Sequence, residues 1–256
     1  RSLDDFELVE EATALGMAGV LVKNHFEPTS ARAALINRRL KAGAKLYGSI
    51  TLNLSVGGIN PYAVESAARL GAKMVWMPTK DSQNHINHEG IGDFRARTGL
   101  TVFSDDGSLK TCVHEVMEVA RQYNVCVSTG HLTTEESFAV CKAGLAAGVQ
   151  MVLTHPEFTP TTISVEVQKQ FVSMGVLIEK DWVNIALKMV TSEEVANSIK
   201  AIGAENIYLA TDRGQASGER PAEGMLLYIE DMLKYGVTPE EIRTMIYTVP
   251  KIVLKE

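Results

Sequence analysis

The stretch NVCVSTGHLTTEESFAV, residues 124–140, contains the unit from which most of the chain is built. Its first half is a short run of apolar and small residues that ends on His131, and its second half begins with TTEE at 133–136. A threonine followed three residues later by a glutamate is the capping box that starts a helix. The short valine-rich run before it is typical of a buried strand. The stretch therefore predicts a strand that ends at a histidine, then a short loop and a helix.

The same unit recurs along the chain. Other apolar runs that end on a histidine or an acid are GVLVKNH (19–25), MVLTHPE (151–157), GVLIEKD (175–181) and NIYLATD (206–212). Two more strands are expected at 45–54 and 72–77, and a helical pattern follows every strand. Seven strands that alternate with helices predict a parallel sheet, and one further helix is expected in front, at 4–15.

This count fits an α/β fold, a (β/α)8 TIM barrel that lacks its first strand, with a doubly wound open sheet as the alternative. We favour the barrel because no glycine-rich phosphate loop follows an early strand, and because polar residues end strands all along the chain. We treat residues 1–256 as a single domain. Residues 79–108 are too long for an ordinary connection, so we expect an insertion that forms a lid over the barrel mouth, with a small hairpin at TGLTVFSDDG (98–107).

Composition limits the class of partner. The chain has 256 residues, of which 45% are hydrophobic and 22% charged, and its net charge is -6. This charge argues against nucleic acid or an anionic membrane as a partner, and favours a small-molecule substrate. The three cysteines, Cys112, Cys126 and Cys141, are an odd number without paired spacing, which indicates reduced thiols in a cytoplasmic protein. A homo-oligomer is the default expectation for such an enzyme.

Three residues at strand ends carry the chemistry that we expect. In a parallel barrel all carboxyl ends open on one face, so His131, His155 and Asp212 are predicted to converge there. Imidazole and carboxylate are the donors that zinc and related ions prefer. A carboxylate beside an activated water can take its proton and pass it to the leaving group, the role that we assign to Asp212. The alternative is that each residue is only a hydrogen-bonded strand end.

Other polar residues are candidates for contacts with metal or substrate. His25 and Lys23 lie two residues apart, which places both on the same face of their strand. His25 is expected as a metal ligand or a substrate contact, and Lys23 as a base, a Schiff-base amine or a paired lysine. Lys80 is expected to bind substrate or to hold a bridging carbamate, and Glu179 to support the site or act as a base.

Several motifs together resemble those of the amidohydrolase superfamily of metal-dependent (β/α)8 hydrolases, in a poorly characterised branch. They are GVLVKNHFEPT (19–29), VWMPTKDS (75–82), STGHLT (128–133), THPEF (154–158), ATDRGQ (210–215) and EEIRTMIYTVPKIVL (240–254). The resemblance covers nearly the whole chain. It implies that His131, His155 and Asp212 bind metal and that Asp212 moves the proton. It also implies a ligand role for His25, as in polymerase-and-histidinol-phosphatase barrels, and a substrate contact for His88.

The chain departs from the superfamily in two places. The HxH pair of the first strand is absent, and because similar proteins carry it just before the segment that begins here at Arg1, we expect this strand to be missing from the sequence. Lys80 lies two residues beyond the Pro78 that ends its strand, which weakens its match to a bridging lysine.

The resemblance implies a hydrolase that activates water on one or two divalent ions. We expect zinc, with manganese or iron as alternatives, and cleavage of an amide, a lactone or a phosphate ester. Two other functions remain open at this point. One is a metal-free lyase or aldolase with Lys23 or Lys80 as the Schiff-base amine. The other is a non-catalytic barrel that binds a ligand.

Overall fold

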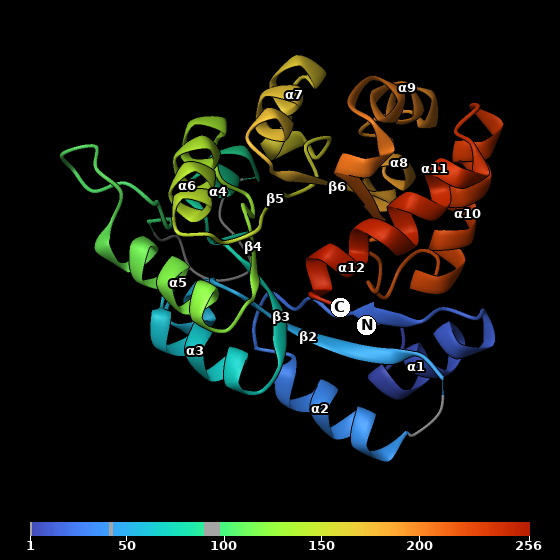
Figure 1. The fold of residues 1–256 in the computed structure, drawn as a ribbon, viewed down its shortest axis with the longest axis horizontal. Coiled ribbons are helices and arrows are strands. Elements are labelled where there is room, and N and C mark those ends of the chain that lie inside the picture. Colours follow the sequence, from blue (N-terminus) through green and yellow to red (C-terminus); the bar gives the residue numbers. More distant parts are fainter. Residues whose placement is uncertain (1, 41–42, 90–97) are drawn as a thin grey trace.

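The computed structural model describes residues 2–40, 43–89 and 98–256. Within them, seven parallel strands form one curled sheet in sequential order, with helices on its outer side (Figure 1). The strands are β1 (Gly19–Leu21), β2 (Lys45–Thr51), β3 (Ala72–Trp76), β4 (Cys126–Ser128), β5 (Met151–Leu153), β6 (Leu177–Asp181) and β7 (Ile207–Ala210). The predicted barrel with one strand fewer than eight is confirmed. A doubly wound sheet is excluded, because the strand order never reverses.

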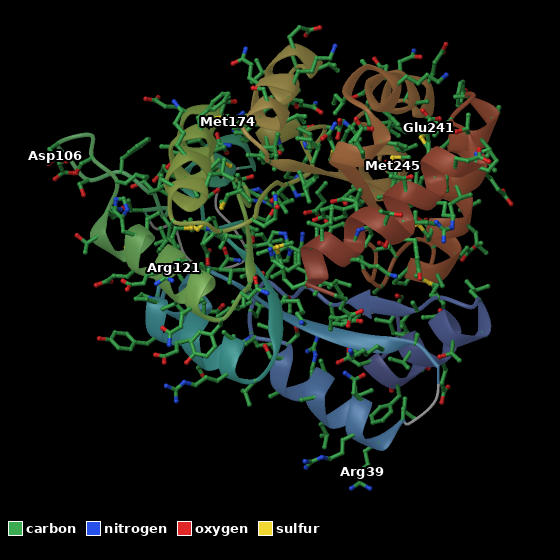
Figure 2. The ribbon with its side chains drawn as sticks, viewed as in Figure 1. Arg39, Asp106, Arg121, Met174, Glu241 and Met245 are labelled. Carbon is green, nitrogen blue, oxygen red and sulfur yellow. The ribbon has the colours of Figure 1, made fainter. Side chains whose placement is uncertain are left out.

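Helices follow the strands as the sequence predicts. The longer ones are α1 (Asp5–Ala14), α2 (Ser30–Arg39), α3 (Pro61–Arg69), α5 (Thr111–Gln122), α6 (Thr134–Ala146), α7 (Val165–Ser173), α9 (Ser192–Ile202) and α10 (Pro221–Lys234). The shorter ones are α4 (Gln83–Glu89), α8 (Trp182–Ala186), α11 (Pro239–Arg243) and α12 (Val249–Leu254). The capping box predicted at Thr133 is formed, and two more are found at Thr191 and Thr238. Charged side chains on the outer surface, such as Arg39 and Arg121, point away from the sheet (Figure 2).

The two faces of the sheet bury different cores. The outer face packs against the helices, with Val75, Val127 and Ile178 among its buried residues. The inner face carries a smaller cluster: Met74, Trp76, Cys126, Val152, Leu177 and Tyr208, joined by Val249 and Val253. The last two belong to α12, which lies inside the curl (Figure 1) and fills the amino-terminal end of the barrel. The carboxyl end is left for polar residues.

The edge strands β1 and β7 meet through side chains. No ladder pairs these two strands in the described part of the chain. Lys23, which follows β1, instead forms an ion pair with Asp212, which follows β7, with Nζ 3.1 Å from Oδ1. Near the same seam, the backbone N–H of Ser2 donates to the carbonyl of Gly214 at 3.0 Å, and α1 packs against α10. A charged contact therefore spans the seam at the mouth.

Several strands end earlier than the sequence predicts. The apolar runs were expected to stay in strands as far as His131, His155 and Asp212, but the ladders stop at Ser128, Leu153 and Ala210. The backbone explains the difference, because φ is +62° at Gly130, +22° at His155 and +45° at Asp212. A positive φ turns the chain out of the sheet, so the polar residues stand on bends above the strands.

The described part of the insertion after β3 contains helix α4 and the stretch from residue 98 onward. Its helix α4 contacts the 3₁₀ turn η2 (Thr159–Thr161) in the loop after β5. The predicted hairpin at 98–107 amounts to a single antiparallel bridge between Phe103 and Leu109. Part of the predicted lid, residues 90–97, lies outside the described residues. No helix in the described ranges is both long and apolar enough to cross a membrane.

Candidate active site

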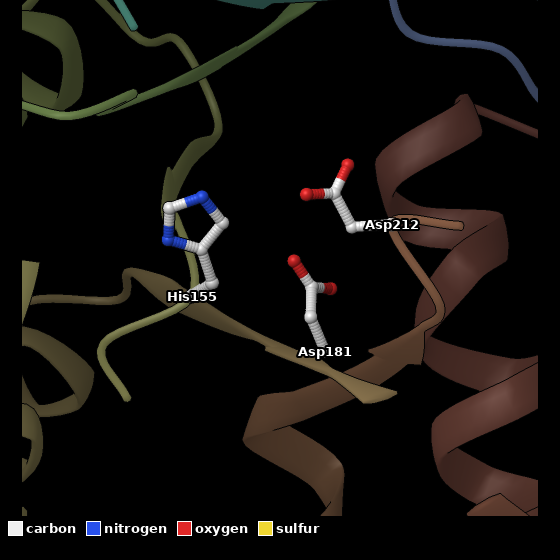
Figure 3. A group of neighbouring side chains, drawn as sticks. All are labelled: His155, Asp181 and Asp212. Carbon is white, nitrogen blue, oxygen red and sulfur yellow. The ribbon is translucent and has the colours of Figure 1, made fainter. Parts of the chain in front are cut away.

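Three donor side chains meet at the carboxyl ends of the last three strands. They are His155, after β5, Asp181, at the end of β6, and Asp212, after β7 (Figure 3). One ligand atom from each lies within 4.8 Å of the others. One imidazole and two carboxylates are a donor set that zinc and other divalent ions accept. We call these three residues the carboxylate group.

Asp181 is the carboxylate of this group that is least compensated by its surroundings. Both of its carboxylate oxygens are buried, and neither has a hydrogen-bond partner among the described residues. Burial, with the nearby carboxylates of Glu179 and Asp212, raises the pKa of Asp181 well above its ordinary value. A buried carboxylate without a partner is costly, and a bound cation would remove that cost. The residues present therefore fit a divalent metal ion.

Asp212 is held in its ionised form by Lys23. Burial by itself would raise the pKa of Asp212, but the ammonium of Lys23, helped by His155 and His25, brings it below the ordinary value. The ion pair joins Nζ of Lys23 to Oδ1 of the Asp212 carboxylate. Asp212 is thus a carboxylate that can accept a proton.

Lys23 is an ion-pair lysine. Burial would lower its pKa, but the carboxylates of Asp212, Glu179 and Asp181 outweigh burial and raise it above the ordinary value. Its ammonium also lies 5.4 Å from the centroid of the Trp76 ring. A Schiff-base lysine needs a depressed pKa to be a free amine. This environment argues against the lyase alternative that uses Lys23.

Four imidazoles gather on the other side of the mouth. The ring centroids of His131 and His155 are 4.9 Å apart, and those of His131 and His25 are 6.4 Å apart. His85, on α4, is closer to His131, at 4.8 Å between centroids and 2.9 Å between the two Nδ1 atoms. The Phe158 ring packs beside three of them, with its centroid 4.9 Å from that of His155, 5.1 Å from that of His131 and 6.0 Å from that of His85.

Burial keeps three of these imidazoles, His25, His131 and His155, neutral. Burial and the charge of Lys23 lower the pKa of His25 to about 4 and that of His155 to about 3. Burial and neighbouring His155 lower the pKa of His131 well below its ordinary value. The neutral ring is the form that binds a metal ion.

The backbone is strained where the carboxylate group is attached. His155 and Asp212 both have left-handed φ values, which non-glycine residues adopt at a cost of about 1 to 3 kcal/mol. The loop at His155 is secured by Thr161, whose hydroxyl donates to the His155 carbonyl at 3.2 Å, and by the N–H of Phe158, which donates to the same carbonyl at 3.0 Å. Such strain is typical of residues positioned for function.

The carboxylate of Glu219 contacts the residues that follow Asp181 and Asp212 in the chain. Glu219 accepts a hydrogen bond from the indole N–H of Trp182 at 2.6 Å and pairs with Nε of Arg213 at 2.8 Å. Trp182 directly follows Asp181 in the chain, and Arg213 directly follows Asp212. Glu219 therefore ties together the two segments whose spacing sets the carboxylate group.

Most of the predicted site residues are brought together. Lys23, His25, His131, His155 and Asp212 all lie at the mouth, as the contacts above show. Glu179 precedes Asp181 by two residues on β6, so both side chains lie on the same face of the strand. Its carboxylate accepts a hydrogen bond from the phenol O–H of Tyr208 at 2.8 Å. Its role as a substrate contact stays a prediction.

Two of the predicted substrate contacts stand apart. His88 is exposed in the last turn of α4, and its Nδ1 donates to the carbonyl of Asn84, one turn back, at 2.9 Å. Lys80 is exposed at the rim, close enough for its charge to help lower the pKa of His25. Neither side chain contributes to the carboxylate group.

Sequence reasoning missed two residues of the site. Asp181 could have been found, because it lies two positions after Glu179 and period-2 alternation puts both on the inner face of β6. His85 had a weaker signal, a three-residue spacing from His88 that fits two ligands on one helical turn but also a surface turn. It lies in a helix of the insertion, and only the folding of α4 across the mouth brings it to His131.

Residues 1–179 match the model of the family of unknown function DUF6282. The chain belongs to this family. A comparison with the curated proteins finds no match.

Solved structures share the fold at low sequence identity. An amidohydrolase from Pseudomonas aeruginosa matches 99% of this chain and 93% of its own, with a TM-score of 0.69 and 14% identity. A phosphotriesterase homology protein from Escherichia coli, with phosphate in its active site, matches 97% and 89%, with a TM-score of 0.59 and 10% identity. A variant of an organophosphorus hydrolase from Deinococcus radiodurans matches 97% of this chain and 82% of its own, with a TM-score of 0.57 and 13% identity. The resemblance inferred from the sequence is confirmed at the level of the fold.

Proposed function

We propose that this protein is a metal-dependent hydrolase of a small-molecule substrate. The observation that carries the proposal is the pair of buried oxygens on Asp181, which have no hydrogen-bond partner among the described residues and belong to a group completed by His155 and Asp212. Three carboxylates, those of Glu179, Asp181 and Asp212, surround one ammonium, that of Lys23. When all three are ionised, the mouth carries an excess of negative charge that a dication would compensate.

One imidazole and two carboxylates suit zinc, manganese and iron, and we propose zinc with the other two ions as alternatives. Asp181 and His155 would hold the ion, with the carboxylate of Asp212 beside it. A bound ion would polarise the scissile carbonyl or phosphoryl group and lower the pKa of a coordinated water. His131 and His25 stay in our proposal as further ligands.

Asp212 is the base in this mechanism. Lys23 keeps its carboxylate ionised, so Asp212 can take the proton of the attacking water. The same carboxyl then returns the proton to the leaving group. Lys23 also holds Asp212 in position across the seam of the barrel. The ring of Phe158 packs against the histidine side of the mouth, with its centroid 5.1 Å from that of His131.

The bond cleaved is proposed only as a class. An amide, a lactone and a phosphate ester all present an oxygen that an ion can polarise and a leaving group that Asp212 can protonate. The fold is shared with an amidohydrolase and with phosphotriesterase-type proteins, which supports testing both carbonyl and phosphoryl substrates. Specificity resides in the loops above the strands, and these differ between proteins of one fold.

The test is metal content and turnover in matched variants. The wild-type protein, purified without chelator, is screened against chromogenic esters, lactones and phosphotriesters, with metal per chain measured by elemental analysis. Asp212→Asn is expected to keep bound metal but lose turnover by at least about a hundredfold, the usual contribution of a general base. Glu223→Gln, on the exposed face of α10, is the control and is expected to change neither. Full turnover by Asp212→Asn would refute the assigned role.

A further inference from the structure

A buried ion pair lies on the other side of β6 from the carboxylate group. Lys180, on β6, is fully buried, and its ammonium pairs with the carboxylate of Glu157, in the loop after β5. The ammonium also donates to Oε1 of Gln168, on α7, at 3.1 Å. Because side chains alternate along a strand, Lys180 points toward the helices, whereas Glu179 and Asp181 point into the barrel. The ion pair therefore does not enter the site itself.

This ion pair is a poor source of stability. Taking an ammonium and a carboxylate out of water costs free energy that their attraction repays only when their other polar atoms are satisfied. Oε2 of Glu157 is buried, and it has no hydrogen-bond partner among the described residues. Apolar side chains of similar size would hold the strand and the helix together at least as well. We therefore expect Lys180 and Glu157 to have a role other than stability.

The ion pair joins the two segments that carry His155 and Asp181. Glu157 follows His155 by two residues, and Lys180 directly precedes Asp181. The ladder between β5 and β6 ends two residues before His155 and three before Asp181. Backbone pairing therefore does not set the spacing of these two donor side chains. The ion pair connects the segments beyond the point where the ladder stops.

The same network secures the whole loop that bends at His155. Gln168, which binds the ammonium, also donates from Nε2 to the carbonyl of Ile163 at 2.8 Å, and the N–H of Ile163 donates to the carbonyl of Pro156 at 2.9 Å. The start and the end of the loop are thereby held together, next to the left-handed φ of +22° at His155. A strained backbone of this kind persists only where its surroundings hold it in place.

We propose that Lys180 and Glu157 are positioning residues that hold the imidazole of His155 within reach of the two carboxylates of its group. Glu219 ties together the segments of the two aspartates, and the ion pair supplies the corresponding tie to the histidine. The ligand atoms can then stay within 4.8 Å of one another although the backbone at His155 is strained. This inference rests on the proposed function, because it concerns the ligands of the same site.

The experiment removes both charges together and measures metal affinity. The double variant Lys180→Met/Glu157→Leu leaves neither charge of the pair buried alone, so it is expected to unfold in urea at or above the wild-type midpoint. Its affinity for Mn²⁺ in isothermal titration is expected to fall about 10- to 100-fold, the usual effect of losing a group that orients a ligand. Lys169→Met, which removes an exposed lysine from α7, is the matched control and is expected to bind Mn²⁺ as wild type does.

A second measurement reports on His155 directly and needs no metal. Nuclear magnetic resonance of the imidazole rings is recorded on metal-free protein, and the His155 signals are assigned by their loss in His155→Ala. In the double variant these signals are expected to shift, because the loop is free to relax. The signals of His114, which is exposed on α5, are expected to stay unchanged. A pair that only stabilised the fold would leave the His155 signals of a folded variant in place.

The outcomes separate this inference from the proposed function. Wild-type Mn²⁺ affinity or unshifted His155 signals in the folded double variant overturn the positioning role. If that variant does not fold, Glu157→Ala, which leaves Lys180 its hydrogen bond to Gln168, is tested with the same two measurements and the same criteria. A wild-type protein that binds no metal counts against the proposed function, and the His155 signals then still test the positioning role.

Discussion

Replacement of Asp181 by asparagine is expected to stabilise the metal-free protein while it weakens metal binding. Both carboxylate oxygens of Asp181 are buried without a partner among the described residues, and Glu179 and Asp212 repel its charge. A buried polar group without partners costs about 1 to 3 kcal/mol, and more when it is charged. Asparagine keeps the shape and removes the charge. We therefore expect Asp181→Asn to raise the free energy of unfolding, in chelator at pH 8, by about 1 to 3 kcal/mol.

The effect has a defined pH dependence. The pKa of Asp181 is raised in the folded protein, so its folded form takes up a proton more readily than its unfolded form. Wild-type stability relative to the variant is therefore greatest below the ordinary value of 3.8 and falls as the pH rises above it. The two proteins are expected to be equally stable near pH 4 and to diverge toward pH 8.

Two assays test this prediction. Urea unfolding in chelator, followed by circular dichroism from pH 4 to pH 8, gives the stability difference. Titration with Mn²⁺ gives the affinity, which is expected to fall by more than about a hundredfold, or roughly 2.7 kcal/mol, upon loss of a charged ligand. A variant that is less stable than wild type at pH 8 in chelator, or that binds Mn²⁺ equally well, would refute the electrostatic reasoning.

Three further predictions concern the supports of the site. Gly130→Ala places a Cβ 2.3 Å from the carbonyl oxygen of Met77. We expect it to lower the free energy of urea unfolding about twice as much as Gly148→Ala, whose Cβ meets no neighbour and whose left-handed φ costs about 1 to 2 kcal/mol. Glu219→Ala is expected to weaken Mn²⁺ binding about 10- to 100-fold by titration, with affinity unchanged in Glu223→Ala. Lys23→Met is expected to lower the free energy of unfolding of the metal-free protein, in chelator, by about 2 kcal/mol in the same urea assay. Saturating Zn²⁺ is expected to recover most of this loss, and an equal loss with and without Zn²⁺ would contradict the charge argument.

The strand ends show which residues of the site could be predicted from the sequence. His131, His155 and Asp212 were found because each follows a buried run, and a parallel barrel gathers such positions on one face. Asp181 was accessible by the same rule, since it alternates with Glu179 on β6. The partner of Lys23 could not be named from the sequence. It lies 189 residues away, across two edge strands that share no ladder, so only the curl of the sheet reveals the pair.

The backbone at the mouth was beyond pattern reasoning as well. Hydrophobic periodicity continues to the polar residue and so predicts strands that are too long, whereas the left-handed φ values at His155 and Asp212 end the ladders earlier. The bend at His155 is held by contacts within its own loop, such as the Thr161 hydroxyl on the His155 carbonyl. Hydrophobic periodicity does not report hydrogen bonds of this kind.

The sequence by itself determined the alternation of strands and helices, the capping boxes, the parallel barrel and the face on which its polar residues gather. These features follow from periodicity and from local hydrogen bonding, which act over a few residues. Only the tertiary structure decided that Asp181 lies near two other carboxylates without a hydrogen-bond partner in the described part of the chain, that Lys23 neutralises Asp212, and that α4 brings His85 to His131. The physical reason is that charge and ligand geometry depend on distances between segments far apart in the chain, and those distances exist only once the sheet has curled.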